Sequence, residues 1–307
     1  MRDLRYACRL LVSRPGFTLA TVLSLALGIG ANVTIFSFIN EVFLRPLPIT
    51  APDRVMAIHT SDKKIGDTQA LSHLNWKDLR EANETFVGIA GYDWTPMSVS
   101  TAGEPIHVVG QLVSGNYFDV LGVRAALGRT FLAEEDATLN THPVAVLSHY
   151  FWSRRLGADP DIVGQTLEIN AYPFTVIGVA PPEFKGLELG VQPELWVPMM
   201  MNPVIQPATV GLWYETRRGL FVYSFGRLEP GVTQGNAAAD LKTIAARLER
   251  EYPDVNKNRS VRIEPVVRAA IAPWARDGVT RGSALMMAAA VLVLLIVCAN
   301  VANLLLA

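Results

Sequence analysis

Cysteine is scarce in this chain, and the other residues that bind metals are scattered. The 307 residues include two cysteines, Cys8 and Cys298, which lie near opposite ends. So few cysteines exclude a disulfide framework, and neither has a second ligand at useful spacing. The five histidines are equally dispersed, so we expect them in the core or on the surface rather than in a metal site. We therefore expect neither a metal nor a cofactor.

Motifs that would indicate catalysis are also missing. No G-x-x-x-x-G-K-[ST] phosphate loop, H-E-x-x-H zinc motif or G-x-S-x-G nucleophile motif occurs. Ser61–Lys64 matches S-x-x-K, but no S-D-N or K-T-G follows, and we interpret the match as chance. The net charge of -1 gives no basic excess that would attract nucleic acid. We expect a protein that is not an enzyme and does not bind nucleic acid.

Charge is absent from two long segments, one at each end of the chain. Pro15–Asn40 and Gly282–Ala307 contain no Asp, Glu, Lys or Arg, and both are rich in apolar residues. A helix that crosses the bilayer core needs about 20 apolar residues. We therefore expect transmembrane helices at residues 17–44 and 283–307, on either side of an extracytoplasmic domain at residues 45–280.

The charges before the first apolar segment predict its orientation. Four arginines, opposed only by Asp3, precede it: Arg2, Arg5, Arg9 and Arg14. The positive-inside rule places this end in the cytoplasm and the large domain outside. A cleaved signal peptide is the alternative. The apolar run is too long for the core of such a peptide, and residues 40–42 offer no small-residue cleavage site.

Residues 1–16 have an amphipathic pattern of their own. Arginines recur at helical spacing on one face, and apolar residues recur on another. A helix of this kind lies in the headgroup plane of a membrane. Two interpretations stay open for this cytoplasmic helix. It is either a charged flank that sets topology, or a docking helix whose Arg5 and Arg9 contact a cytoplasmic partner.

Small or polar residues recur at every fourth position of the first apolar segment, at Ala20, Ser24, Gly28 and Asn32. This spacing allows another helix to approach closely, and Asn32 could hydrogen-bond across the contact. In the second segment, Asn300 and Asn303 lie on nearly the same helix face. If both segments are centred in the bilayer, Asn32 and Asn300 lie at depths that differ by on the order of 10 Å. We therefore expect each of them to contact other helices rather than one another.

Between the apolar segments, the pattern predicts a mixed α/β domain. Helices are expected at 72–83, with Ser72 as N-cap, and at 231–251, with one apolar face formed by Leu241, Ile244, Ala245 and Leu248. Strands are expected at 55–60, 105–113, 144–147, 166–170, 174–179, 221–228 and 261–267. We expect a discontinuous outer lobe at 45–123 and 216–270, with an inserted β-rich lobe at 124–215.

Short motifs run in order through nearly the whole chain: Arg2–Tyr6 (RDLRY), Arg14–Thr18 (RPGFT), Leu25–Asn32 (LALGIGAN), Arg45–Pro48 (RPLP), Ser114–Leu121 (SGNYFDVL), Leu127–Phe131 (LGRTF), Val144–Ser148 (VAVLS), Ile162–Asn170 (IVGQTLEIN), Val176–Pro181 (VIGVAP) and Cys298–Ala307 (CANVANLLLA). As a set they resemble the N-terminal portion of MacB/FtsX-like ABC transporter permeases. The resemblance implies a MacB-like periplasmic core domain with a porter-like outer lobe. It also implies a multi-pass protein of the bacterial inner membrane that is driven by an ABC-type ATPase and forms a homodimer or pairs with a related permease.

Two hypotheses for function follow. In the first, the chain is a permease subunit that couples ATP hydrolysis by a partner ATPase to motion of the external domain, for efflux or extraction of a substrate. In the second, it is a membrane-anchored periplasmic sensor or scaffold that binds a periplasmic partner without ATPase coupling. Permeases of the family carry at least four membrane helices. The second apolar segment ends at Ala307 without a basic flank, so we also expect the chain to be truncated.

Overall fold

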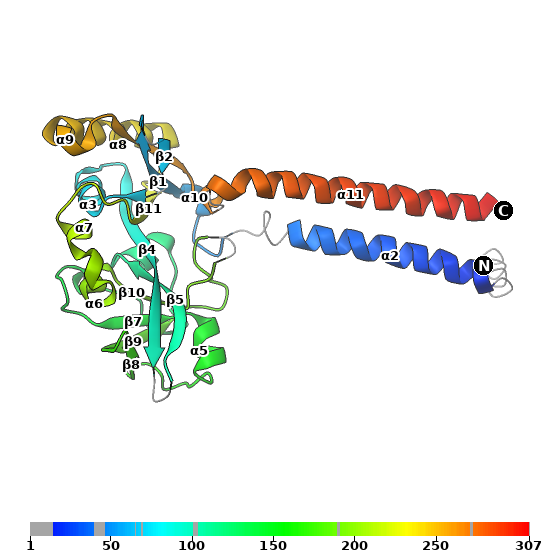
Figure 1. The fold of residues 1–307 in the computed structure, drawn as a ribbon, viewed down its shortest axis with the longest axis horizontal. Coiled ribbons are helices and arrows are strands. Elements are labelled where there is room, and N and C mark those ends of the chain that lie inside the picture. The colour runs from blue at the N-terminus through cyan, green and yellow to red at the C-terminus, as the bar shows by residue number, and fades with distance from the viewer. Residues whose placement is uncertain are drawn as a thin grey trace. The chain divides into compact units, whose positions relative to one another are not determined.

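The structure, a computed structural model, describes residues 15–39, 47–64, 66–68, 70–100, 104–188, 191–270 and 273–306. The chain divides into two compact units, one built from its two ends and one from Leu47–Ile271. The end unit contains α2 (Pro15–Ile39) and α11 (Pro273–Leu306), which pack side by side and antiparallel (Figure 1). Within the described ranges, no helix combines the length and the hydropathy needed to cross a membrane. The spans expected at 17–44 and 283–307 are therefore not confirmed, and the helix expected at 1–16 lies outside the described residues, apart from Pro15 and Gly16 at the start of α2.

The unit Leu47–Ile271 is built on one mixed sheet. Its described strands follow the order β12-β1-β11-β4-β5-β10-β7-β9-β6, and β2, β3 and β8 pair beside this path. The strands are β1 (Val55–Asp62), β2 (Gly66–Thr68), β3 (Ala70–Leu71), β4 (Phe86–Ser100), β5 (Ile106–Val113), β6 (Leu127–Gly128), β7 (Val144–Leu147), β8 (Thr166–Ile169), β9 (Tyr172–Val179), β10 (Leu195–Pro198), β11 (Val222–Leu228) and β12 (Arg259–Pro265). The mixed α/β architecture expected from the sequence is confirmed.

Helices and helical turns connect these strands. The α-helices of this unit are α3 (His73–Ala82), α4 (Tyr117–Leu121), α5 (His149–Arg155), α6 (Asn202–Ile205), α7 (Val210–Tyr214), α8 (Gln234–Glu251), α9 (Pro253–Asn256) and α10 (Val266–Ala269). The 3-10 turns are η2 (Pro52–Arg54), η3 (Ala133–Asp136), η4 (Met199–Met201) and η5 (Pro207–Thr209).

Local sequence explains the two longest helices of this unit. The Ser72 hydroxyl accepts the backbone N–H of Asn75 at 3.3 Å, which caps α3 as expected. Thr233 caps α8 in the same way, through the N–H of Asn236 at 3.2 Å. The apolar face expected on α8 is buried, which confirms its helical period.

The order of strands follows the two expected lobes. β12, β1, β11, β4 and β5 come from the segments 45–123 and 216–270, whereas β10, β7, β9 and β6 come from 124–215. β5 and β10 pair in parallel at the border, so the sheet is continuous from one group to the other. The limits of the lobes stay a prediction, because backbone hydrogen bonds join the two groups into one sheet.

β4 (Phe86–Ser100) is the strand that links the two groups. Its first half pairs with β11 from Phe86 to Tyr92, and its second half pairs with β5 from Tyr92 to Val99. The sequence did not predict this strand, because Gly88, Gly91 and Pro96 interrupt its β pattern. Tertiary packing requires glycine at position 91, because a Cβ there would lie 2.9 Å from Trp76 Cε2. The ring of Trp76 therefore occupies the space of the missing side chain.

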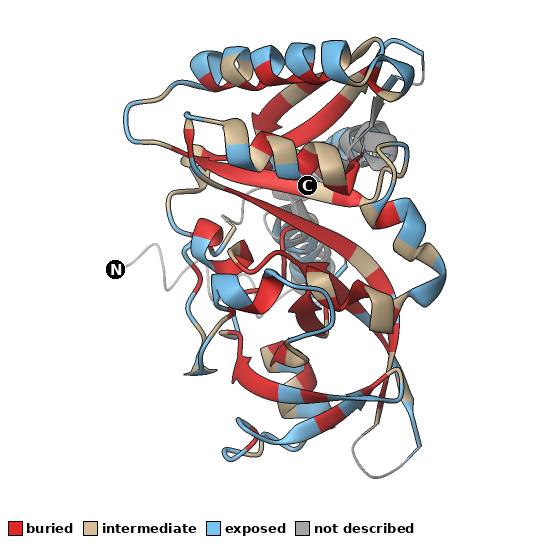
Figure 2. Cartoon of the chain, turned by 90° about the vertical axis from the view of Figure 1, so that its left-hand side faces the viewer, coloured by how far each residue is buried: buried red, intermediate tan, exposed pale blue. Residues whose placement is uncertain are grey.

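Long stretches of the strands are buried (Figure 2), and alternating side chains give the sheet two different cores. We call one the helix-covered face, because α3 and α8 cover part of it; it includes Trp76, Leu79, Leu112, Leu241 and Val222. We call the other the aromatic face; its buried members include Tyr92, Tyr117, Phe118, Phe184, Trp196 and Phe225. On β11, for example, Val222 belongs to the first and Phe225 to the second.

Candidate functional site

The small-residue pattern of the first apolar segment meets α11 at one described position. Gly28 is buried, and a Cβ placed on it would lie 2.5 Å from Val297 Cγ2. Val297 is itself buried on α11. Gly30, two residues further along α2, would have no atom within 4 Å of an added Cβ. The close approach of the two helices therefore depends on the missing side chain at Gly28.

The other residues expected at helix contacts are only partly described. The Asn32 side chain is half-buried, and its Nδ2 donates to the Gly28 carbonyl of its own helix at 2.8 Å. That bond lies within α2, whereas the sequence suggested a bond to another helix. Ala20 and Ser24 lie on α2, and Asn300 and Asn303 lie on α11, but their side chains are outside the described part of the structure, as are Arg5 and Arg9.

The motif Ser114–Leu121 connects β4, β5 and α4. Ser114 Oγ accepts the N–H of Gly91 at 3.0 Å and donates to Asn116 Oδ1 at 2.7 Å. Asn116 Nδ2 then donates to the carbonyl of Ile89 at 3.1 Å. Tyr117 is fully buried on the aromatic face. The motif therefore links β4 to the start of α4 through side-chain hydrogen bonds, and nothing in its geometry suggests a reaction.

Asp136 holds two backbone segments together from the end of η3. Its Oδ2 accepts the N–H of Gly115 at 3.0 Å, and its Oδ1 accepts the N–H of Met200 at 2.9 Å. Burial raises the pKa of this carboxyl group to about 6, against the lowering effect of the bonds from Met200 and Gly115. Asp136 is a structural carboxylate, because both of its oxygens are used by the backbone.

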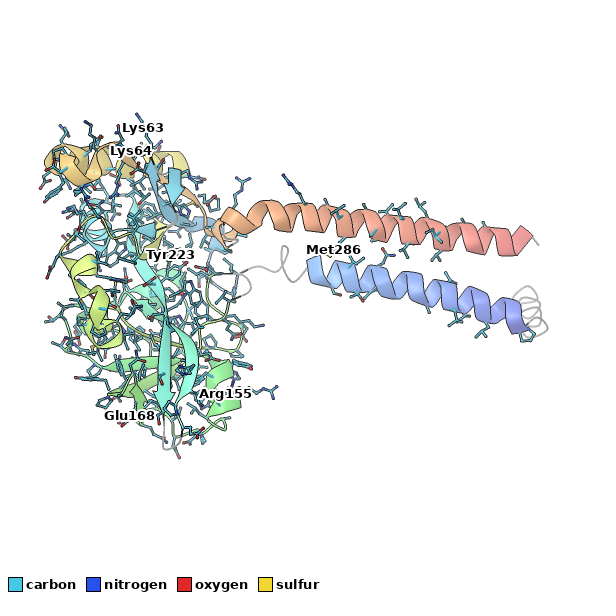
Figure 3. All side chains as sticks on the ribbon, viewed as in Figure 1. Lys63, Lys64, Arg155, Glu168, Tyr223 and Met286 are labelled. Atoms are coloured by element: carbon cyan, nitrogen blue, oxygen red, sulfur yellow. The ribbon has the colours of Figure 1, made fainter. Side chains whose placement is uncertain are left out.

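The described residues enclose a pocket on the aromatic face, beneath α10. Its floor comes from β1, β4 and β11, with Ala57, Tyr92 and Tyr223 among its members (Tyr223 is labelled in Figure 3). Its roof includes Ala269 of α10 and Glu188, from the segment before β10. The enclosed part of this space measures about 20 Å³, and the pocket opens in part to solvent. We call it the α10 pocket; it lies wholly within the unit Leu47–Ile271.

One carboxylate of the α10 pocket is held by two aromatic donors. Tyr92 Oη donates to Glu188 Oε1 at 2.8 Å, and Trp94 Nε1 donates to the same oxygen at 2.9 Å. Among the described residues, no Lys, Arg or His forms an ion pair with Glu188. Burial, followed by the negative charge of Glu188, raises the pKa of the Tyr92 hydroxyl well above its usual value. Both causes keep Tyr92 protonated, so it can act as a hydrogen-bond donor.

A second polar group lies at the β1 and β12 end of the pocket. His59 Nε2 is 3.1 Å from Glu264 Oε1, and both side chains are buried. Arg262 Nη1 lies 3.6 Å from the other oxygen, Glu264 Oε2. Glu264 is thus flanked by a histidine and an arginine, which compensates for its burial. The expectation that the histidines form no metal site stays untested; among the described residues, no three potential ligands come together.

Sequence patterns did not indicate the residues of the α10 pocket. His59, Tyr92, Glu188 and Glu264 come from separate segments and match no motif. The only local signal is on β12, where Arg262 and Glu264 alternate with Val261 and Ile263. That pattern predicts a strand with one polar face, but it does not reveal that a buried histidine of β1 contacts this face.

Comparison with known proteins settles the family. The model of the MacB-like periplasmic core domain matches residues 18–244. The chain belongs to the family with a MacB-like periplasmic core domain. This result confirms the family resemblance that the sequence motifs suggested. The description of the family places a domain of this type in the periplasm. No curated protein matches the chain.

Three solved structures are similar to this chain at low sequence identity, and the first of them has a TM-score above 0.5. A domain assigned to a permease protein of Porphyromonas gingivalis is 15% identical, with a TM-score of 0.51, over 71% of this chain and 92% of that chain. The periplasmic region of MacB from Actinobacillus actinomycetemcomitans is 16% identical, with a TM-score of 0.49, over 71% and 90%. The extracellular domain of the noncanonic ABC-type transporter YknZ from Gram-positive bacteria is 14% identical, with a TM-score of 0.47, over 68% and 99%.

Proposed function

We propose that this chain is the membrane subunit of an ABC transporter, and that it transmits ATP-driven motion to a MacB-like domain outside the cytoplasm. The family match over residues 18–244 carries the proposal. These 307 residues contain no phosphate loop, so in our proposal an ABC-type ATPase, separate or fused, supplies the energy from outside them. In this role the chain performs no chemistry and needs no cofactor.

The uncharged segments at the two ends support a membrane position for this subunit. In our proposal, residues 17–44 and 283–307 cross the bacterial inner membrane, with the arginine-rich N-terminus in the cytoplasm and the domain in the periplasm. Both ends of the domain would then connect to a membrane helix. A shift between those helices would act on the domain at two points. The substrate would be exported or extracted, with a second copy or a related permease completing the assembly.

The contact between Gly28 and Val297 offers a way to test this role. The chain should be reconstituted in lipid nanodiscs with an ABC-type ATPase from the same organism. We expect no ATP hydrolysis by the chain alone and chain-dependent hydrolysis by the pair. Gly28→Leu should reduce the stimulation several-fold, because Leu cannot fit against Val297.

Gly30→Leu is the matched control, because it adds the same side chain to the same helix at a position with open space. It should leave the stimulation unchanged. Equal loss in both variants would place the effect in α2 as a whole rather than in its contact with α11. If the wild-type chain neither associates with the ATPase nor changes its turnover, the sensor or scaffold hypothesis replaces this one.

A further inference from the structure

The α10 pocket has features that transmission of motion does not require. An ordinary gap between a sheet and a short helix is lined by apolar side chains. Here the partly open pocket has a carboxylate, Glu188, in its wall. Two aromatic side chains, Tyr92 and Tyr223, stand beside it. A concave site with aromatic walls and few polar groups is the usual form of a small-molecule site.

Glu188 is oriented before any ligand arrives. Both donors, Tyr92 Oη and Trp94 Nε1, bind its Oε1 atom, and no described residue donates a hydrogen bond to Oε2. Two neutral donors stabilise the ionised carboxylate without cancelling its charge. The negative charge of Glu188 also contributes, after burial, to raising the pKa of Tyr223. The pocket therefore has a negative potential that a cation would reduce.

The aromatic walls suit the same kind of ligand. The rings of Tyr92 and Tyr223 are stacked, with centroids 5.4 Å apart, and Tyr223 is half-buried, so part of its surface faces the open space. The faces of tyrosine rings attract cations, most strongly where water is partly excluded. A hydrated metal ion does not use such faces well, whereas an ammonium group bearing methyl or methylene groups does.

The charges at the other end of the pocket do not oppose this ligand strongly. His59 is the basic group among the lining residues, and it lies against the carboxylate of Glu264. Arg262 also lies against Glu264 and is directed to its second oxygen. Lys185 precedes Glu188 by three positions, but its side chain is exposed and forms no ion pair with Glu188 in the described part of the structure.

We propose that the α10 pocket binds an alkylammonium group, with Glu188 as its counter-ion, oriented by Tyr92, and with the half-buried ring of Tyr223 as its aromatic wall. The group can belong to a small organic cation or to a lysine side chain of a partner protein. Ala269 forms part of the roof, and α10 precedes α11 along the chain, so an occupant contacts the last helix before that segment. The proposal does not depend on ATPase coupling, because the pocket lies within a single unit.

Tetramethylammonium titration of the full chain in detergent tests the binding. The readout is the indole N–H signal of Trp94 in ¹⁵N NMR spectra, assigned with Trp94→Phe, because this proton is bonded to Glu188. We expect a saturable shift in the wild-type chain and affinity about tenfold weaker in Glu188→Gln. The glutamine keeps an oxygen for Tyr92 and Trp94, so the fold is retained while the charge is lost.

Matched variants separate the pocket from general charge effects. Glu183→Gln removes one charge from an exposed position of the same segment and should leave the affinity unchanged. Tyr223→Phe keeps the ring face and should bind like the wild type, whereas Tyr223→Leu should bind several-fold more weakly. Equal affinity in the wild type and Glu188→Gln, or no saturable shift in the wild type, would overturn the proposal.

Three further titrations identify the source of the ammonium group. A short extended peptide with one lysine is compared with the same peptide carrying acetyl-lysine and with free n-butylammonium. If the lysine peptide binds more tightly than n-butylammonium and the acetylated peptide does not bind, the occupant is a partner's lysine. If both amines bind equally, the occupant is a small organic cation. Equal binding of the acetylated and unmodified peptides would contradict an ammonium site.

Discussion

The two faces of the sheet differ in what covers them and in how their polar atoms are used. On the helix-covered face, α3 and α8 cover an aliphatic core that includes Leu79 and Leu241. On the aromatic face, α4, α10 and irregular segments cover tyrosines and tryptophans whose polar tips find partners. Tyr92 and Trp94 bind Glu188, and the Trp196 indole N–H binds Gln111 Oε1 at 2.8 Å.

We infer from this difference that the helix-covered face contributes mainly to stability, whereas the aromatic face carries the groups suited to recognition. Side chains without polar atoms can be packed closely beneath regular helices, and such cores contribute most to stability. An aromatic side chain with a polar tip needs a partner when buried, and the partner brings charge or an amide into the core. The aromatic face therefore contains an oriented carboxylate beside an open space. The helix-covered face also has an open space, between α3 and α8, but no carboxylate is among its described lining residues.

The largest effect is expected where the helix-covered face is most closely packed. Trp76 is 1% exposed and packs against Gly91. Trp76→Ala should lower the free energy of unfolding by about 4 kcal/mol, because it opens a cavity that no neighbouring side chain can fill. Denaturant titration followed by circular dichroism measures the loss. Tyr223→Ala, at a half-buried site of the aromatic face, should cost clearly less; an equal cost would remove the distinction in stability between the faces.

An intermediate effect is expected from a carboxyl group on the helix-covered face. Asp93 lies between Tyr92 and Trp94, which pack on the aromatic face, so strand alternation places it on the opposite one. Burial raises its pKa from 3.8 to about 7. The unfolded chain therefore loses this proton first as pH rises, and stability falls across the window from 3.8 to about 7.

Asp93→Asn should remove this penalty. At pH 8 the variant should be more stable than the wild type, by on the order of 3 kcal/mol, and the gain should shrink as the pH approaches 4. Chemical unfolding of both proteins at several pH values measures the difference. A gain that does not change with pH would show that packing, and not the charge of Asp93, is responsible.

The smallest effect is expected when one tryptophan on each face is replaced by phenylalanine and the losses of stability are compared. The Trp76 indole N–H has no hydrogen-bond partner among the described residues, whereas that of Trp196 is bonded to the buried Gln111. Trp76→Phe and Trp196→Phe remove equal volume, but only the second breaks a bond. Trp196→Phe should therefore cost about 1 kcal/mol more in unfolding free energy. Equal costs would contradict the view that polar tips stabilise the aromatic face.

The sequence predicted the two longest helices and seven strands of the domain, but not the strand that joins its two groups of strands. The Ser72 cap of α3, the apolar face of α8 and the runs at β1, β5, β7, β8, β9, β11 and β12 are local patterns, and the structure confirms them. β4, the short strands β2, β3, β6 and β10, and the shorter helices were missed. β4 contains glycines and a proline, and its need for Gly91 comes from Trp76, a residue of another element.

Of the two candidate sites, a local sequence pattern indicated the helix contact at Gly28 but not the α10 pocket. The four-residue spacing in the first apolar segment included Gly28, and the structure places Val297 of α11 against that residue. The α10 pocket gave no such signal, because β1, β4, β11, α10 and the segment before β10 each contribute only one or a few residues.

The sequence by itself therefore determined the uncharged ends, the helices with their caps, most strands and the family motifs, because each depends on residues close together in the chain. Tertiary structure alone decided the order of the strands, the difference between the two faces and the pairing of Glu188 with Tyr92 and Trp94. The physical reason is that hydrogen bonds across a sheet and burial of a carboxylate depend on distances in space, and no periodicity along the chain records those distances.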